Sequence, residues 1–364
     1  MKLGPFMPKR TTIIDVAELA GVSTMTVSRV MSGSPKVRES TRQKVKKAIS
    51  TLNYQPEFSA RALSKKITGN LGFLVRYGNE NREFYHQVAN GIEDELNKHD
   101  YSLISHYRPF DAAHLPSLIT QRKVDGAIVG GVKVDEEVIK ALQDRALPVV
   151  VIDNFLDVEG IHFVFPDYQN GADEAVRYLN RLGHRNIAFI GKDSKYFCTI
   201  CKLEGYRNAL EQTGNKIRKE CILFERSKDF KIKDLIRQIM LEKEKVTAVL
   251  CANDSIACNF VKILRENRIK VPDDVSIIGF NNTKLAEINL PALTTVHVDK
   301  ELIGSLAAQK LLESIRNPKT VSTKTVIETR LIIRDSCKEN RKSQAANNNK
   351  KHFINRGDVA LFNS

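Results

Sequence analysis

The stretch that decides the fold is TIIDVAELAGVSTMTVSRVMSG, which spans residues 12–33. Thr12 is of a residue type that caps helix N-termini, and the apolar residues after it recur at helical spacing. Gly21 can adopt the positive φ that commonly ends a helix. A first helix is therefore expected between them, with an apolar stripe formed by Val16, Ala17, Leu19 and Ala20.

A second helix is predicted directly after this turn. Val22 can plug the turn, and Ser23 can cap a helix that runs to about Met31. Two helices joined by so short a turn meet at a steep angle, so the second one protrudes. This arrangement is typical of a helix-turn-helix, in which exposed residues at the start of the second helix enter a DNA major groove, here Thr24, Met25 and Ser28.

A third helix is predicted to close the small core of this head. Ser40 followed by Gln43 three residues later matches the capping-box pattern. One face of the helix is apolar and is formed by Val45, Ala48, Ile49 and Leu52. The other face is basic, suits sequence-independent attraction to DNA phosphates, and carries Arg42, Lys44, Lys46 and Lys47.

The positive charge is concentrated at the ends of the chain. The formal net charge is +14, and residues 1–70 hold 13 Lys and Arg against 4 Asp and Glu. Residues 71–335 hold 38 against 37, and residues 336–364 hold 6 against 2. A basic head on a neutral body is typical of polyanion binding by the head. Composition alone leaves a solvated basic face as an equal alternative.

Composition also limits the class of protein. The 364 residues are 42% hydrophobic, which is enough for two or three structural units. No apolar run reaches the length of a membrane span, and residues 1–10 lack the apolar core of a secretory signal. The six cysteines make no disulfide framework. We therefore expect a cytoplasmic protein without a membrane partner, with a flexible start at 1–11 and a disordered tail at 336–364.

The motifs of the head resemble those of the LacI/GalR family of transcription regulators. The matching segments keep the family spacing and are Asp15-Val-Ala, Ala20-Gly-Val-Ser23, Thr26-Val-Ser-Arg29-Val30, Thr41-Arg42 and Leu52-Asn-Tyr54-Gln-Pro56. The resemblance implies a DNA-binding domain over 12–57. It places Arg29 where it can pair with guanine, and Met25 where it can touch a thymine methyl group or other apolar base edges. The DNA contacts that we expect in this domain are Thr12, Ser23, Thr24, Met25, Thr26, Ser28, Arg29 and Tyr54.

The next segment, 58–68, has helical propensity but is too short to be stable alone. The same resemblance implies a hinge helix that forms on operator DNA, pairs with its mate in a homodimer and wedges Leu63 into the minor groove. Ser59, Arg61 and Ala62 are expected to contact DNA beside it. A plain linker with Leu63 packed on the core is the alternative.

From residue 71 onward short apolar runs alternate with helical patterns. Strands are predicted at 71–75, 102–105, 127–129 and 149–152, and helices between them at 84–98, 115–121 and 136–145. The pattern restarts with strands at 187–190, 248–251 and 276–280. Such alternation is typical of parallel sheets covered by helices on both faces, so we expect an α/β core of two doubly wound lobes. A crevice between the carboxyl ends of the two sheets suits a small polar ligand.

The core resembles the same family, which shares its fold with periplasmic sugar-binding proteins. The matching segments are Val124-Asp-Gly126, 182–191, Glu204-Gly-Tyr206, Ala252-Asn253-Asp254, 271–280 and Leu293-Thr-Thr295. The resemblance implies a ligand-binding and dimerisation core over 69–335. From it we expect Asp153 and Asp254 to accept hydrogen bonds from an effector and Phe84, in the first βα loop, to stack on it, with Lys202 and Asn281 also in the site. Helix capping or a salt bridge is the alternative for each carboxylate.

Several positions depart from the family pattern. Lys202 stands where many sugar-sensing members have arginine, so a point charge replaces a planar fork. Asn281 and Asn282 replace the usual aspartates, and Glu83 replaces a usual proline. Cys198 and Cys201 form a C-x-x-C near the crevice, which without further ligands favours ordinary loop cysteines over a metal or redox site. An unusual effector is therefore expected.

These features together predict a DNA-binding regulator and not an enzyme. A helix-turn-helix domain would read a near-palindromic operator as a homodimer, and a sugar or sugar derivative bound between the core lobes, with no cofactor, would control it. A global regulator of the same family controlled by a phosphocarrier protein is one alternative, and a free solute-binding protein is another. An enzyme is disfavoured because no phosphate-binding glycine loop and no nucleophile with its base are found in the sequence.

Overall fold

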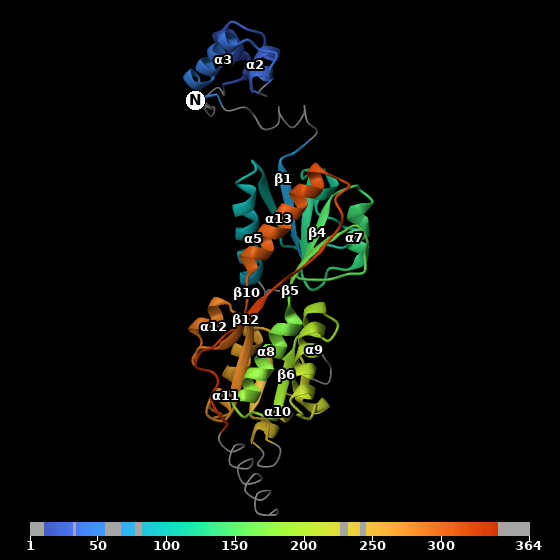
Figure 1. The fold of residues 1–364 in the computed structure, drawn as a ribbon, viewed down its shortest axis with the longest axis vertical. Coiled ribbons are helices and arrows are strands. Elements are labelled where there is room, and N and C mark those ends of the chain that lie inside the picture. Colours follow the sequence, from blue (N-terminus) through green and yellow to red (C-terminus); the bar gives the residue numbers. More distant parts are fainter. Residues whose placement is uncertain are drawn as a thin grey trace, which may run out of the picture. The chain divides into compact units, whose positions relative to one another are not determined.

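The structure is a computed structural model that describes residues 11–31, 34–54, 67–76, 82–225, 232–240 and 245–340. It divides into two compact units, with the division between Gly69 and Asn70 (Figure 1). The smaller unit is the helical head and the larger unit is the α/β core. Within the described ranges, none of the helices combines the length and the apolar character that crossing a bilayer demands.

The head consists of the predicted helices around a small apolar core. They are α1 (Ile13–Ala20), α2 (Thr24–Met31) and α3 (Glu39–Thr51). Thr12 and Asp15 form a capping box at the start of α1, and Gly21 ends it with a φ of 65°. The side chains that close the core are Val16, Ala17, Val27, Val30, Val45, Ala48 and Tyr54.

Two predictions about the head are wrong in detail. Leu19 does not belong to the buried stripe, since 54% of its surface is exposed. The capping box expected from Ser40 and Gln43 does not form, because α3 begins at Glu39 and Arg38 occupies the cap position without a side-chain hydrogen bond. Gln43 donates instead to Glu39 across one turn.

The first core lobe is a doubly wound sheet, as predicted. Its strand order is β11-β5-β4-β3-β1-β2, with all pairs parallel. The strands are β1 (Asn70–Val75), β2 (Ser102–His106), β3 (Gly126–Gly130), β4 (Val149–Ile152), β5 (His162–Pro166) and β11 (Lys324–Ile327). Side chains alternate along β1, where Phe73 and Val75 join one hydrophobic cluster and Leu74 joins another. Helices therefore cover both faces, and they are α5 (Arg82–Leu96), α6 (Ser117–Thr120), α7 (Glu136–Gln143) and α13 (Lys300–Arg316).

The second lobe repeats this plan. Its strand order is β12-β10-β9-β8-β6-β7, parallel except for β12, which runs antiparallel to β10. The strands are β6 (Ile187–Gly191), β7 (Ile222–Phe224), β8 (Ala248–Cys251), β9 (Ser276–Asn281), β10 (Thr294–Val298) and β12 (Thr329–Ile332). Its helices are α8 (Tyr168–Arg181), α9 (Phe197–Gln212), α10 (Ile232–Met240), α11 (Asp254–Glu266) and α12 (Lys284–Ile288), with a short 3-10 turn at Lys219–Cys221.

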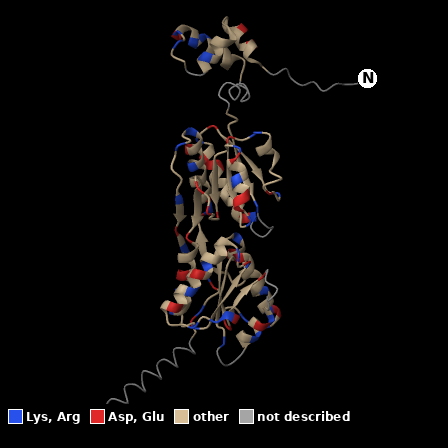
Figure 2. Ribbon diagram, turned by 90° about the vertical axis from the view of Figure 1, so that its right-hand side faces the viewer, with Lys and Arg blue, Asp and Glu red and all other residues tan. Residues whose placement is uncertain are grey.

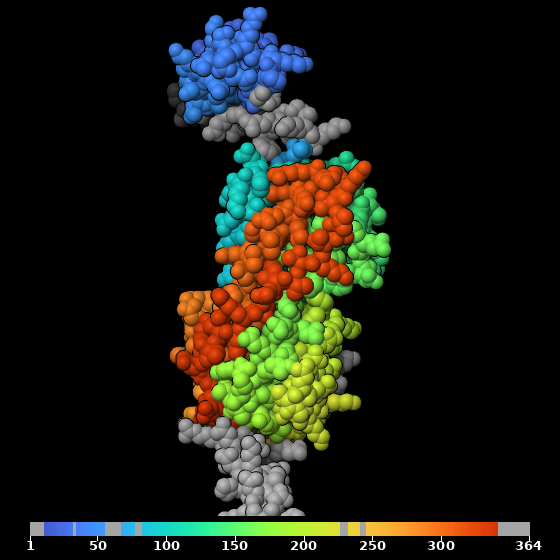
Figure 3. Space-filling model, viewed as in Figure 1, coloured from blue at the N-terminus to red at the C-terminus, as the bar shows by residue number. Residues whose placement is uncertain are grey.

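The chain crosses between the two lobes three times. Each crossing passes through one acidic residue: Asp167 between β5 and α8, Asp299 between β10 and α13, and Glu328 between β11 and β12. Asp167 and Asp299 also cap the helices that follow them, accepting from the N–H groups of Asn170 and Leu302. Figure 3 shows the last part of the chain, in orange and red, running over both lobes. The alternating pattern of the sequence did not predict these crossings.

The core extends further along the chain than predicted. Ser336 is fully buried, accepts from the Thr294 N–H and donates to the Ile277 carbonyl oxygen. Lys338 donates its N–H to the Ser276 hydroxyl. The boundary placed at Asp335 is therefore wrong, since a tail that starts at 336 would leave these buried polar groups without partners.

Helices α5 and α13 lie in close contact on the first lobe. A Cβ at Gly91 would lie 2.0 Å from the Glu301 carbonyl oxygen, and one at Gly304 would lie 2.1 Å from that of Val88. Beside this contact the carboxylate of Glu95 is buried and accepts from Lys98, Gln309 and Ser305. The hydrogen bond from Lys98 is the main reason that the pKa of Glu95 is lowered to about 2.

We expect Glu95→Gln to destabilise the core at neutral pH by about 1–3 kcal/mol, because hydrogen bonds to a charged acceptor are lost. Since the folded pKa lies below that of the unfolded chain, the stabilisation is present above about pH 4.5 and is lost as the pH falls toward 2. Urea unfolding measures the free energy of unfolding of the parent chain and of Glu95→Gln. The difference between the two values should become smaller from pH 7 to pH 3. Exposed Glu93→Gln on the same helix is the control, and a difference independent of pH would contradict the charge-based explanation.

Candidate functional site

The exposed face of α2 carries the residues predicted to read DNA. Thr24, Met25, Ser28 and Arg29 are exposed, and 61% of the Met25 surface is accessible. Val27 and Val30 face the opposite way and are buried against α1 and α3. The helix therefore presents one polar and one apolar face, and its polar face is available to a partner.

Three other predicted DNA contacts have structural partners within the head. The Ser23 hydroxyl caps α2 by accepting from the Thr26 N–H at 3.2 Å. It also lies 3.0 Å from the Thr26 hydroxyl. The Thr12 hydroxyl and N–H both bond Asp15. Tyr54 is only 7% exposed, and its ring packs in the core of the head. The apolar cluster therefore holds the ring, and contact of Tyr54 with DNA stays a prediction.

Figure 2 colours the Lys and Arg positions of the head blue along the ribbon. The exposed ones from α2 onward are Arg29, Lys36, Arg38, Lys44, Lys46 and Lys47. Arg42 differs from them, because it donates to the Ser34 carbonyl oxygen and pairs with Glu39 at 3.2 Å. Arg42 thus fixes the start of α3 instead of offering its charge to DNA. The predicted hinge contacts Ser59, Arg61, Ala62 and Leu63 lie outside the described residues.

The second candidate site is a cleft where the strands of both lobes end. It encloses about 640 Å³, including space open to solvent. Val132 and Lys133 follow β3, Asp153 follows β4, Lys192 follows β6, and Ala252 and Asn253 follow β8. The remaining lining residues are Phe84, Tyr168, Tyr196, Cys198, Thr199, Lys202 and Asn281. The predicted crevice at the carboxyl ends of the parallel strands is thus present.

Asp153 lies at the bottom of the first lobe's side of the cleft. Its backbone has a φ of 58°, a conformation that aspartate tolerates better than most residues. Its carboxylate accepts hydrogen bonds from the hydroxyls of Tyr85 and Tyr168. Burial raises the pKa of Asp153 despite these two bonds. The prediction placed Asp153 correctly but missed both tyrosines, whose separations of 68 and 15 residues from Asp153 give no local signal.

Lys202 lies opposite, in the first turns of α9, and is only 4% exposed. Its ammonium donates to the Ala252 carbonyl oxygen at 2.9 Å. It also lies 4.4 Å from the ring centre of Tyr168 and 4.2 Å from that of Phe280, which is cation–π geometry. Burial lowers its pKa. A carbonyl oxygen and two aromatic rings therefore hold the lysine in place.

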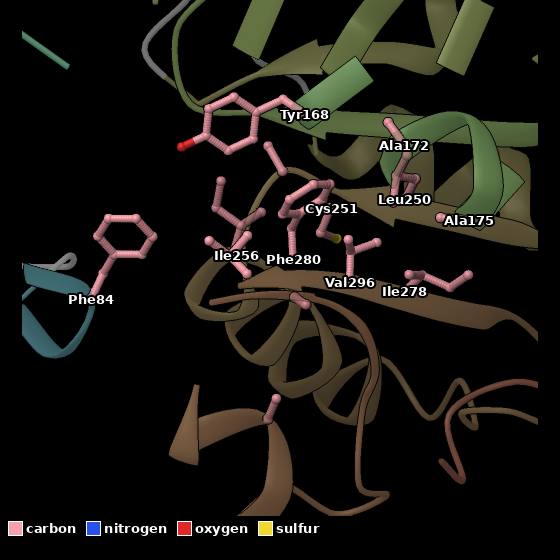
Figure 4. Packing of buried hydrophobic residues seen from close by; sticks show 14 of the residues in the cluster. Phe84, Tyr168, Ala172, Ala175, Leu250, Cys251, Ile256, Ile278, Phe280 and Val296 are labelled. Carbon is pink, nitrogen blue, oxygen red and sulfur yellow. The ribbon is translucent and has the colours of Figure 1, made fainter. Parts of the chain in front are cut away.

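Phe84 and Asn281 also line the cleft. Phe84 belongs to the first turn of α5 and not to a loop as predicted, because that helix begins at Arg82. In Figure 4 its ring extends from α5 toward Tyr168 and Ile256 of the other lobe. Asn281 ends β9 with a φ of 99°, and its carbonyl oxygen accepts from Lys300 at 2.7 Å. Both side chains can therefore contact a molecule held between the lobes.

Asp254 has protein donors for its carboxylate, and its contact with an effector stays a prediction. It is fully buried at the first position of α11 and lines a smaller pocket that adjoins the cleft and shares Phe84, Asn253 and Asn281 with it. One carboxylate oxygen accepts from the Thr295 hydroxyl at 2.6 Å, and the other accepts from the N–H and hydroxyl of Thr283 at 2.7 and 3.0 Å. Burial raises its pKa to about 6. Its neighbour Asn253 lines the cleft itself and caps α11.

The C-x-x-C pair begins α9. Cys198 lines the cleft, and Cys201 lies one turn further along the helix. Burial raises the pKa of each thiol to about 11. Thiols with so high a pKa are mostly protonated and thus weak nucleophiles at neutral pH.

A helix-turn-helix head with an exposed basic face, followed by a two-lobed α/β core with a cleft, defines a DNA-binding transcription regulator. Residues 12–57 match the model of bacterial regulatory proteins of the lacI family, and residues 176–337 match that of the periplasmic binding protein-like domain. Catabolite control protein A of Priestia megaterium is 34% identical, over 90% of this chain and 99% of that protein. The chain belongs to the lacI family and is a regulator, not an enzyme.

Solved structures agree with this assignment. The complex of the transcriptional regulator CelR with cellobiose is 28% identical to this chain, with a TM-score of 0.65 over 90% of this chain and 100% of that one. The lac repressor dimer bound to operator and the anti-inducer ONPF is 24% identical, with a TM-score of 0.71 over 91% of this chain and 100% of that one. The lac repressor thus shares the fold of both units.

We expect Asp254→Ala to lower the free energy of unfolding by about 2–4 kcal/mol, because the buried Thr295 hydroxyl and two partly buried donors of Thr283 lose their acceptor. Chemical denaturation of the full chain measures this loss. The exposed Asp157→Ala change, within about 0.5 kcal/mol of the parent, is the control. A loss for Asp254→Ala as small as that of the control would show that this carboxylate is not structural.

Proposed function

We propose that this chain represses carbohydrate-related genes and that a sugar or sugar derivative bound in the interlobe cleft controls its affinity for operator DNA. The observation that carries the proposal is the lining of the cleft. It combines the aromatic rings of Phe84, Tyr168 and Tyr196 with the amides of Asn253 and Asn281. Aromatic faces stack on sugar rings, and amides bond their hydroxyls. The similarity to a regulator solved with cellobiose supports a carbohydrate ligand.

Control of this kind requires that ligand binding alter the relation of the two lobes. Asp153 of the first lobe accepts from Tyr168 of the second, and Glu83 on α5 accepts from the Lys284 N–H of α12 at 2.6 Å. A ligand that touches both lobes would strengthen or replace such contacts. A coupling of about 1–3 kcal/mol to DNA binding is typical for such regulators.

The experiment starts with selection of duplexes from a random pool by the full chain. Fluorescence anisotropy on the selected duplex then measures how candidate sugars change the affinity for DNA. A chain that prefers no duplex sequence over bulk DNA at low salt would contradict the DNA-binding part of the proposal. If none of the small molecules changes the affinity for the selected duplex, the proposal that an effector controls DNA binding would be contradicted.

The reading of DNA is proposed to depend on Arg29, which is exposed on α2. We expect Arg29→Ala to reduce the preference for the selected duplex over random DNA by about 5- to 150-fold, the equivalent of one paired contact to guanine. Competition binding measures this ratio. Lys46→Ala, on the basic face of α3, is the matched control and should weaken binding to all duplexes alike. An unchanged ratio for Arg29→Ala would refute its role in base reading.

The chain is proposed to act as a homodimer on a near-palindromic operator, since two copies of α2 would read two half-sites. The second lobe presents an apolar surface at α12 that suits a self-complementary contact. Its exposed side chains are Leu285 at 38%, Ile288 at 64% and Leu290 at 82%. Three neighbouring apolar side chains of this size are seldom left in water without a partner.

We expect Ile288→Glu to weaken the dimer at least about tenfold, because a carboxylate would be buried against apolar side chains. Sedimentation velocity over a concentration series measures this dissociation. The control is Ile200→Glu on α9, which lies across the lobe from α12 in Figure 1 and is 42% exposed. Equal dissociation of both variants, or of neither, would place the dimer contact elsewhere.

A further inference from the structure

The lysines of the cleft suggest what kind of effector it takes, and the inference rests on the function proposed above. Among the described residues, the lining holds Lys133, Lys192 and Lys202, whereas Asp153 is its only carboxylate. Glu83 and Asp254 line a smaller adjoining pocket. A site built for neutral sugars needs hydroxyl acceptors as much as donors. This lining is instead rich in cationic donors and poor in anionic acceptors.

Lys202 is the decisive residue. Its ammonium is buried, yet within the described ranges no carboxylate oxygen lies within 4.0 Å of it. A carbonyl oxygen and two ring faces stabilise it but carry no net charge. The carboxylates of Asp153 and Asp254 attract this ammonium only from beyond 4.0 Å. The buried cation therefore remains costly, and an anion bound beside it would offset that cost.

The other charged groups do not cancel this excess. Lys192 is already paired with Glu225 at 2.9 Å, whereas Lys133 is exposed and takes part in no ion pair of the described residues. Asp153 accepts from two tyrosine hydroxyls. Burial raises its pKa and lowers that of Lys202, so it disfavours both charges, and the lining still holds three lysines against one carboxylate. The cleft therefore keeps an excess of positive charge.

Two helix N-termini add to the positive potential. α9 begins next to the lining residues Tyr196, Cys198 and Thr199. α11 begins at Asn253, which also lines the cleft. The positive ends of two long helices thus reach the same space as the unpaired ammonium of Lys202.

We infer that the effector of this cleft is an acidic sugar derivative, whose anionic group lies against Lys202 and Lys133 while its ring faces Phe84. A phosphate and a carboxylate share the chemistry that this site recognises. Lysine offers a point charge and not the planar fork that pairs with a carboxylate, which favours a phosphate group.

The first test uses inorganic phosphate and the full chain. At equal ionic strength, phosphate should raise the melting temperature above that in chloride, and Lys202→Met should lose most of this shift. Lys195→Met is the matched control, because Lys195 is exposed nearby but does not line the cleft. Any phosphate bound by the DNA-binding head is common to all variants. Equal shifts in the parent and in both variants would overturn the inference.

The second test compares matched ligands by calorimetry: glucose, glucose 6-phosphate and glucuronate, and the same sets built on galactose and ribose. The best acidic ligand should bind at least about tenfold more tightly than its neutral parent. Lys202→Met should weaken binding of this acidic ligand about 10- to 100-fold, which is the contribution of a charge-assisted hydrogen bond. The affinity for the neutral sugar should change less than about threefold. Lys133→Met, at an exposed position, provides a second variant if Lys202→Met does not fold.

The outcomes separate this inference from the function on which it rests. A neutral sugar that binds as tightly as its acidic partners and changes operator affinity would overturn the acidic ligand and leave the effector function intact. If no ligand of either kind binds and operator affinity never changes, both fail. A preference for the phosphate over the carboxylate, or the reverse, identifies which acidic group the site takes.

Discussion

The two core lobes are joined by three chain crossings, and this constraint determines how the cleft can work. Because each crossing is a single residue between regular elements, the lobes can change their angle but cannot separate. Two contacts at the cleft involve residues that directly follow these crossings. Tyr168 follows the first, and Lys300 follows the second and donates to the Asn281 carbonyl oxygen. A ligand that binds there acts directly on the hinge.

The first strand of the core ends beside the cleft. β1 is the strand through which the chain enters the core, and Arg76, directly after it, pairs with Asp135 next to the cleft loop that carries Lys133.

Most of the fold could be predicted from the sequence, since hydrophobic periodicity and cap residues are local signals. Thr12, Gly21 and Ser23 marked the helix ends correctly, and the strands at β4 and β8 fall where the apolar runs lie. One error concerns a helix end, and one side chain has a position that depends on tertiary packing. Ser40 matches a capping box, but the helix begins one residue earlier, at Glu39. Tyr54 looks like a polar contact residue but fills the core of the head.

The candidate site was less predictable, because the roles of its residues depend on neighbours remote in sequence. Asp153 and Asp254 both follow a core strand, yet one lines the cleft and the other is enclosed by Thr283 and Thr295. The net charge of the core is likewise a poor guide to the electrostatic potential in the cleft. The core is nearly neutral by count, but most of its charged side chains lie on the surface, where water screens them. Only the few groups with little access to water set the potential that a ligand meets, and in this cleft the least accessible of the lysines, Lys202, lacks a carboxylate partner among the described residues.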